Sequence, residues 1–131
     1  MKDYHSVHEL HYHLVLPIKY RRNIITDTIS QYLKTIFTRV GNNHNITLQE
    51  WNHDKDHIHA IFTATPATHL SKFINAYKSA SSRLIKKDYP GIKKQLWESM
   101  FWSRSYYLST VGNTTLETVK NYVATQGDDQ Q

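Results

Sequence analysis

The chain of 131 residues and 15.4 kDa is about one domain long, and its net charge of +5 favours a polyanionic partner. The absence of cysteine excludes a disulfide framework, a thiolate zinc site and a cysteine nucleophile, and no apolar run approaches the ~20 residues that cross a bilayer. A polar N-terminus without a signal-peptide core and an aromatic content of 12% complete the prediction of one ordered, cytoplasmic domain over residues 1–131, with 126–131 as a frayed tail.

The first predicted elements are a strand and a helix. A mostly apolar run predicts a strand over residues 10–17. Apolar side chains then recur at helical spacing from Ile29 to Val40, which predicts a helix. Thr26 or Asp27 is expected to cap its beginning, and Gly41 is expected to close it.

A hairpin and a second helix are expected next. Alternating patterns predict strands over 46–52 and 57–64, joined by the polar tip at 53–56. Pro66 stands where a helix could begin, and an amphipathic pattern continues to Lys87.

The last predicted elements are a strand and a third helix. Aromatic and β-branched residues predict a strand over 101–111. Thr114 and Glu117 form a capping box that opens a helix running to about Gln126. The order β-α-β-β-α-β-α predicts an α+β fold of the ferredoxin/RRM-like kind, with helices packed on an antiparallel sheet of four to five strands.

The basic residues are unevenly placed. Seven basic residues and a single acid lie between positions 72 and 94, with aromatic residues close by in the sequence. Cations beside stacking surfaces are typical of proteins that bind single strands, although a solvated helix face is the simpler interpretation. The candidate DNA contacts are Lys19, Arg21, Arg22, Lys78, Arg83, Lys86 and Lys87.

Two histidine pairs have the spacing His-x-His. Side chains alternate along a strand, so His57 and His59 are expected on one face while Ile58 points into the core. Such a pair can bind one metal ion or one phosphate, or it can be merely polar and exposed. His11 and His13 have the same spacing, and spacing alone does not choose between the pairs.

A tyrosine and a glutamine share one side of the predicted last helix. Tyr122 and Gln126 are four residues apart, at the edge of its apolar stripe, so their hydroxyl and carboxamide groups are expected at the rim of the core. A packed tyrosine beside a solvated glutamine is the alternative.

Motifs in several parts of the chain resemble one known family. The sequence contains, in order, HLVLPIKYRR, DKDHIHAIF, KSASSRLI, LWESMFW, STVG and ETVKNYVATQ. Together they resemble the HUH single-tyrosine transposases of the insertion sequence 200/605 family, over about residues 12–126. HUH denotes His, a hydrophobic residue and His. Thr118 stands four residues before the tyrosine, where many two-tyrosine replication initiators have a second one, which favours the single-tyrosine class.

The resemblance implies a role for each candidate site residue. His57 and His59 match the HUH pair, Tyr122 matches the nucleophile, and Gln126 matches the third metal ligand. His11 and His13 match no catalytic position and are expected to serve structure or DNA contact.

The family also implies a reaction and its partners. Tyr122 would attack single-stranded DNA with the help of Mg²⁺ or Mn²⁺, which would leave a 5′-phosphotyrosine and a free 3′-OH for rejoining. The expected substrate carries imperfect hairpins near the element ends. The expected assembly is a homodimer in which His57 and His59 of one chain face Tyr122 of the other.

Three other functions use parts of the same pattern. A domesticated relative acting on chromosomal palindromes would share all these residues. A non-catalytic module for single-stranded nucleic acid would use the sheet alone, as RRM domains do. A histidine-dependent phosphoesterase would use the His-x-His pair and release a free 5′-phosphate without a protein adduct.

Overall fold

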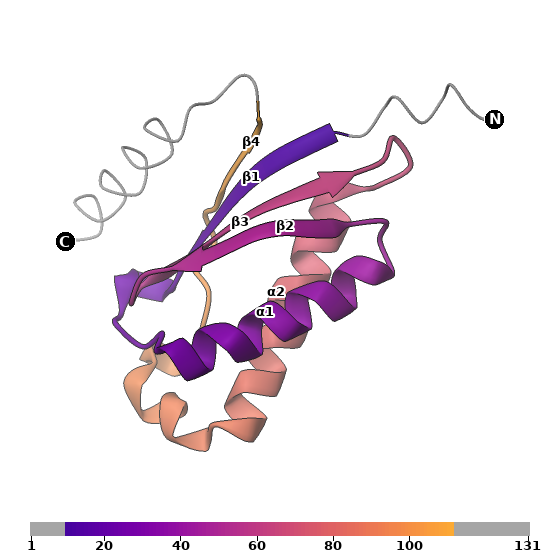
Figure 1. Ribbon diagram of the computed structural model, residues 1–131. Coiled ribbons are helices and arrows are strands. Elements are labelled where there is room, and N and C mark those ends of the chain that lie inside the picture. The colour runs from indigo at the N-terminus through magenta and orange to yellow at the C-terminus, as the bar shows by residue number, and fades with distance from the viewer. Residues whose placement is uncertain (1–9, 112–131) are drawn as a thin grey trace.

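The computed structural model describes residues 10–111, an α+β fold in which two helices pack on a four-stranded antiparallel sheet (Figure 1). The expected fold class is confirmed. The strands and long helices are β1 (Leu10–Pro17), α1 (Asp27–Asn42), β2 (Thr47–His53), β3 (His57–Ala64), α2 (Leu70–Asp88) and β4 (Tyr107–Thr110). Three short 3₁₀ helices are η2 (Lys19–Arg21), η3 (Pro90–Gln95) and η4 (Trp97–Ser99). No helix within residues 10–111 is long and apolar enough to span a membrane.

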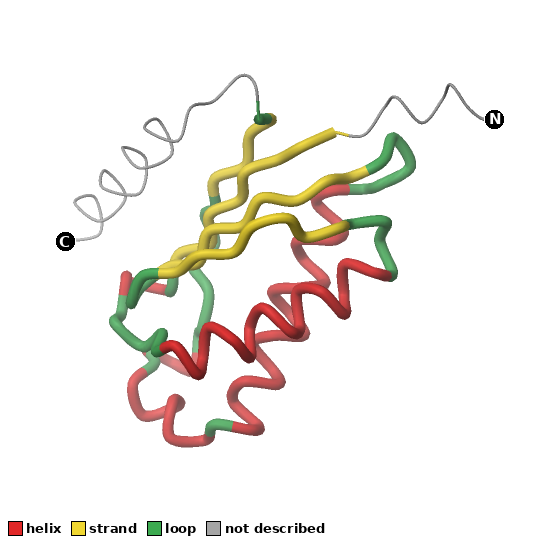
Figure 2. Tube along the Cα trace, viewed as in Figure 1, coloured by secondary structure: helices red, strands yellow, loops and turns green. Residues whose placement is uncertain are grey.

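The sheet has the order β2-β3-β1-β4, and all its neighbouring strands run antiparallel. Both α1 and α2 lie against one face of the sheet, as Figure 2 shows in red and yellow. The opposite face carries no described helix and is called the open face below. β1 and β3 have the predicted bounds and form the centre of the sheet.

The core lies between the sheet and the two helices. Alternate side chains of the central strands, among them Leu14 and Phe62, are fully buried on the helix side. Phe37 of α1 is also fully buried, and its ring contacts those of Phe73 and Tyr77 from α2 at centroid distances of 5.1 and 5.0 Å. This aromatic cluster joins both helices to the sheet and supports the strands that carry the histidines.

Gly41 does not end the first helix, contrary to expectation. The Thr26 side chain caps α1 by accepting a hydrogen bond from the Ile29 amide at 3.2 Å, and the helix continues through Gly41 to Asn42. A β-carbon on Gly41 would lie 3.2 Å from that of Ile46, so the glycine permits a close approach rather than a left-handed turn.

The second helix begins four residues later than Pro66 suggested, at Leu70. Pro66 lies in a turn instead, because hydrogen bonds between Thr65 and Thr68 close the chain around it. The Thr68 hydroxyl also donates to the carbonyl of His44, which ties this turn to the loop after α1.

The predicted strand over 101–111 is only Tyr107–Thr110. Trp102 pairs with Ile18 through an isolated antiparallel bridge, and a bend at Arg104 separates this bridge from β4. The indole of Trp102 donates to the Ser81 hydroxyl of α2 at 2.9 Å. The predicted third helix over 114–126 lies outside the described residues.

Candidate functional site

The histidine pair lies on the open face of β3. His57 and His59 are partly exposed there, while Ile58 and Ala60 between and beyond them are fully buried under the helices. Strand alternation therefore places both imidazoles on one side, as the sequence predicts. Because β3 is paired on both sides, with β1 and β2, the pair has a rigid support.

His57 is oriented by Asp56, which in turn forms an ion pair with Arg21 of η2. Its Nδ1 donates to a carboxylate oxygen of Asp56 at 2.8 Å. The other carboxylate oxygen accepts from Arg21, at 3.0 Å from Nε and 2.9 Å from the terminal nitrogen. Burial alone would raise the pKa of Asp56, but the hydrogen bond from His57 and the Arg21 charge outweigh it and lower that pKa. Asp56 is therefore an anion near neutral pH.

η2 holds Arg21 in an uncommon backbone conformation. Tyr20 and Arg21 both have left-handed φ angles, of 58° and 53°, which residues with a β-carbon rarely adopt. The Arg21 side chain is only 11% exposed. We infer that its ion pair with Asp56 helps to offset the cost of this backbone, which is of order 1–3 kcal/mol for each such residue.

His59 is in contact with a histidine of the neighbouring strand. Its Nε2 and Nδ1 of His13 share a hydrogen bond of 3.4 Å, and the two rings stack with centroids 5.5 Å apart. Burial and the nearby imidazoles lower the pKa of His59, although Glu50 opposes this. Burial lowers the pKa of His13 as well. Both rings are therefore neutral near pH 7, the form that binds metal ions.

His11 and His13, the other His-x-His pair, have different surroundings. His13 is 5% exposed and adjoins His59, whereas exposed His11 contacts Gln49 of β2 at 3.0 Å. β4 adds Ser109, which pairs with His13 in the sheet register. The Ser109 hydroxyl is buried and has no hydrogen-bond partner in the described part of the chain.

His57 and His59 are candidates for two of the ligands that a divalent ion would need. The Asp56 contact leaves Nε2 of His57 available, and the His13 contact leaves Nδ1 of His59 available. A carboxylate on the second nitrogen is the usual support of a metal-binding histidine. Within residues 10–111 no three His, Cys, Asp or Glu residues are grouped so that they could hold a metal ion.

Tyr122 and Gln126 lie outside the described residues, and the structure does not place them. Several predicted DNA contacts have partners within the protein. Arg21 pairs with Asp56, Lys78 donates to the Ser103 carbonyl at 2.9 Å, and Lys86 donates to the Ser99 carbonyl at 2.9 Å. Lys19 lies over the ring of Tyr20, 5.0 Å from its centroid. The remaining predicted DNA contacts are Arg22, Arg83 and Lys87.

Sequence reasoning missed two neighbours of the histidine pair, Asp56 and His13. Asp56 directly precedes His57, and a carboxylate next to a candidate ligand is a signal that could have been used. The contact of His13 with His59 depends on the pairing of β1 with β3, which the sequence order alone does not reveal.

Comparisons with known proteins agree on one family. The family model described as "Transposase IS200 like" matches residues 6–126. The ISDra2 transposase TnpA of Deinococcus radiodurans is 30% identical over 122 residues, which are 93% of this chain and 87% of that protein. The transposase for insertion sequence element IS200 of Salmonella typhimurium is 28% identical over 88% of this chain and 75% of its own length.

Solved structures show the same fold. A crystal structure assigned to a transposase of Deinococcus radiodurans R1 superposes with a TM-score of 0.84, at 28% identity, and covers 96% of this chain and 97% of that one. A REP-associated tyrosine transposase bound to a REP hairpin shares the fold with a TM-score of 0.60 and 15% identity, over 87% of this chain and 62% of that one.

Proposed function

Because the chain belongs to the IS200-like transposase family, we propose that it cleaves and rejoins single-stranded DNA through a covalent bond to Tyr122. The observation that carries the proposal is the His57–His59 pair on the open face, with one ring held by Asp56 and the other by His13. The open face carries no described helix, and His57 and His59 are partly exposed on it.

The proposed reaction is a transesterification. The Tyr122 hydroxyl oxygen bonds to the scissile phosphorus, and the bond from phosphorus to the 3′ oxygen breaks. The phenol loses its proton and the leaving 3′ oxygen gains one, so the products are a 5′-phosphotyrosine and a 3′-OH. The phosphodiester energy is kept in the new bond, and rejoining to a 3′-OH reverses the step without a nucleotide cofactor.

The residues around Tyr122 must compensate for a weak nucleophile, because the ordinary pKa of a tyrosine is ~10. A Mg²⁺ or Mn²⁺ ion bound by His57, His59 and Gln126 would polarise the scissile phosphate. The role of Asp56 and Arg21 is to hold the His57 ring with Nε2 free. His13 does the same for His59 through the other nitrogen.

The open face argues against a non-catalytic RRM-like module. RRM domains stack bases on aromatic side chains of their sheet. Here the central strands present His57, His59 and His13 on the open face, while Tyr12 contacts Phe62 at a centroid distance of 5.6 Å. Histidines held by hydrogen bonds suit a metal-assisted reaction better than they suit base stacking.

The substrate and the assembly are parts of the same proposal. DNA with hairpins is the proposed substrate, since a transposase of the same fold was solved with a REP hairpin. A homodimer is proposed because joining two element ends requires two nucleophiles. A domesticated relative acting on chromosomal palindromes would use the same residues.

Incubation with single-stranded hairpin oligonucleotides and Mg²⁺ tests the proposal. We expect a protein–DNA adduct that survives denaturation, with the phosphotyrosine mapping to Tyr122. Tyr122→Phe should bind the same DNA without forming the adduct. A free 5′-phosphate without an adduct would favour the phosphoesterase, and a linkage at Tyr106 or Tyr107 would refute the assignment.

Replacement of Asp56 tests how the site is supported. Asp56→Asn removes the charge that fixes the His57 ring and is expected to weaken Mn²⁺ affinity by about 10–100-fold. Calorimetric titration with Mn²⁺ in the absence of DNA measures this directly. Asp54→Asn is the matched control, because Asp54 belongs to the same tip and its side chain accepts a hydrogen bond from the Lys55 amide rather than from a histidine. Equal losses in both variants would contradict the positioning role.

A further inference from the structure

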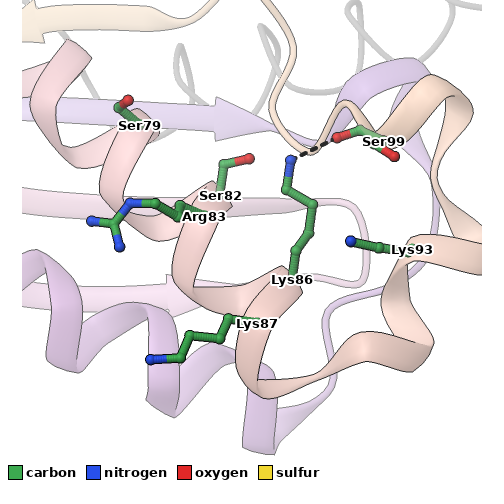
Figure 3. A pocket seen from close by; sticks show the side chains of 7 residues that line it. All are labelled: Ser79, Ser82, Arg83, Lys86, Lys87, Lys93 and Ser99. Carbon is green, nitrogen blue, oxygen red and sulfur yellow. Dashed lines mark hydrogen bonds between the residues drawn. The ribbon is translucent and has the colours of Figure 1, made fainter.

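A hollow of about 550 Å³ lies beside the C-terminal half of α2 and takes no part in the site described above (Figure 3). Four cations line it, namely Arg83, Lys86, Lys87 and Lys93. The hydroxyl residues Ser79, Ser82 and Ser99 complete the lining, and no carboxylate belongs to it.

The sequence of α2 accounts for the shape of this hollow. Ser79, Ser82 and Lys86 follow one another at intervals of three and four residues, which places them on one side of the helix. The buried side of α2, with Ile74 and Tyr77, packs against the core instead. Small serines leave a recess along α2, and the longer cations surround it. η3 and η4 close the recess with Lys93 and Ser99.

One contact holds the two sides of the hollow together. Nζ of Lys86 donates to the Ser99 carbonyl at 2.9 Å, the bond drawn in Figure 3. Ser99 and its neighbour Glu98 have left-handed φ angles of 61° and 49°. The Lys86 bond thus stabilises an uncommon backbone that carries Ser99 into the lining. The hollow is a built feature rather than a chance row of surface lysines.

The remaining cations have no counter-charge. Arg83, Lys87 and Lys93 form no ion pair or hydrogen bond within the described part of the chain. Several like charges around one recess repel each other, and an anion placed among them relieves that repulsion. Arginine, lysine and serine are also the side chains that most often contact phosphate oxygens of DNA.

The hollow is remote from the candidate catalytic face. Its lining residues come from α2, η3 and η4, whereas His57 and His59 lie on β3 and face away from the helices. A phosphate in the hollow is therefore a different phosphate from the one that is cleaved.

We propose that this hollow binds a phosphodiester of the DNA away from the cleaved bond and so anchors the substrate, an inference that rests on the proposed function. A neighbouring groove of about 340 Å³ shares Ser79, Ser82, Lys86 and Ser99 with the hollow. It adds Met100, whose apolar side chain can contact an adjoining sugar or base. One nucleotide can thus place its phosphate in the hollow and its apolar part in the groove.

The double variant Arg83→Gln/Lys93→Gln tests the anchor, with Arg39→Gln/Lys72→Gln as a control of equal charge outside the hollow. Binding is measured without metal ions, so that no cleavage occurs, on a long single strand, a hairpin and a short oligonucleotide that spans only the cleavage site. We expect the Arg83→Gln/Lys93→Gln variant to lose roughly tenfold in affinity for the long single strand or for the hairpin. On a single strand, the slope of the logarithm of its affinity against the logarithm of the salt concentration should become shallower by about 0.7 for each lost phosphate contact.

The three substrates separate the outcomes. A loss confined to the long single strand identifies an unpaired segment as the ligand, and a loss confined to the hairpin identifies its stem. In both cases, binding of the short oligonucleotide without metal ions should stay at the wild-type level, and so should its cleavage in a separate assay with Mg²⁺. Equal losses in the hollow and control variants would overturn the anchor while leaving the proposed function intact. Wild-type protein that binds none of these DNAs would refute the proposed function itself.

Discussion

His57→Ala and His59→Ala are each expected to lower DNA cleavage by roughly 10³-fold, because each removes an imidazole that would hold the divalent ion at the scissile phosphate. Asp56 and His13, the neighbours of the two histidines, are not expected to replace the lost ligand. Asp56 is bound by Arg21, and His13 lies beside His59 only. Formation of the covalent adduct under single-turnover conditions measures the loss. Calorimetric titration with Mn²⁺ should show a matching loss of metal affinity.

His11 and His13 provide the controls. His11→Ala is expected to retain both cleavage and metal affinity, because His11 contacts Gln49 and not the site. His13→Ala is also expected to retain cleavage, but its contact with His59 predicts a measurable fall in metal affinity. A crystal soaked in Mn²⁺ with the ion bound to His11 and His13 would show that the wrong pair has been assigned.

The elements that the sequence predicts well are those set by local pattern. β1 and β3 have the predicted bounds because each is an uninterrupted apolar or alternating run. Thr26 caps α1 as expected because a cap depends on residues within one turn. The shared face of His57 and His59 follows from strand alternation alone.

The features that sequence reasoning missed depend on distant contacts. The close approach of Ile46 requires a small residue at position 41, and the predicted strand over 101–111 is divided between a bridge of Trp102 to Ile18 and the pairing of β4 with β1. The supports of the candidate site are also distant in sequence, since Arg21 reaches Asp56 across 35 positions. A single sequence shows which residue types are present, but it does not show which of them the fold brings together.

A mixture of two inactive variants is expected to regain cleavage if the active sites are shared between chains. Within residues 10–111 no three His, Cys, Asp or Glu residues are grouped to hold a metal ion, and we propose that residues outside this range complete the site. Tyr122 and Gln126 are the candidates for this role. The sequence has a glycine at position 112, before the predicted helix, and the conformational freedom of glycine would let that helix complete the site of either chain.

The variants for this mixture are the His57→Ala/His59→Ala double variant and Tyr122→Phe, each inactive alone. In a mixed dimer with shared sites, the intact tyrosine of the first chain faces the intact histidines of the second, which restores one site. The other site carries both lesions. Equal mixing of a twofold dimer makes about half the dimers mixed, so about a quarter of the sites are restored.

Sites formed within one chain lead to the opposite result, since every site in a mixed dimer then carries one of the two lesions. Co-purification through a tag on one variant must first show that mixed dimers form, because unmixed homodimers would also be inactive. Once mixed dimers are present, activity near a quarter of wild type supports shared sites, and a mixture as inactive as its components rules them out. Tyr122→Phe must also bind DNA like the wild type, because only then does the mixture report the position of the nucleophile rather than a loss of substrate.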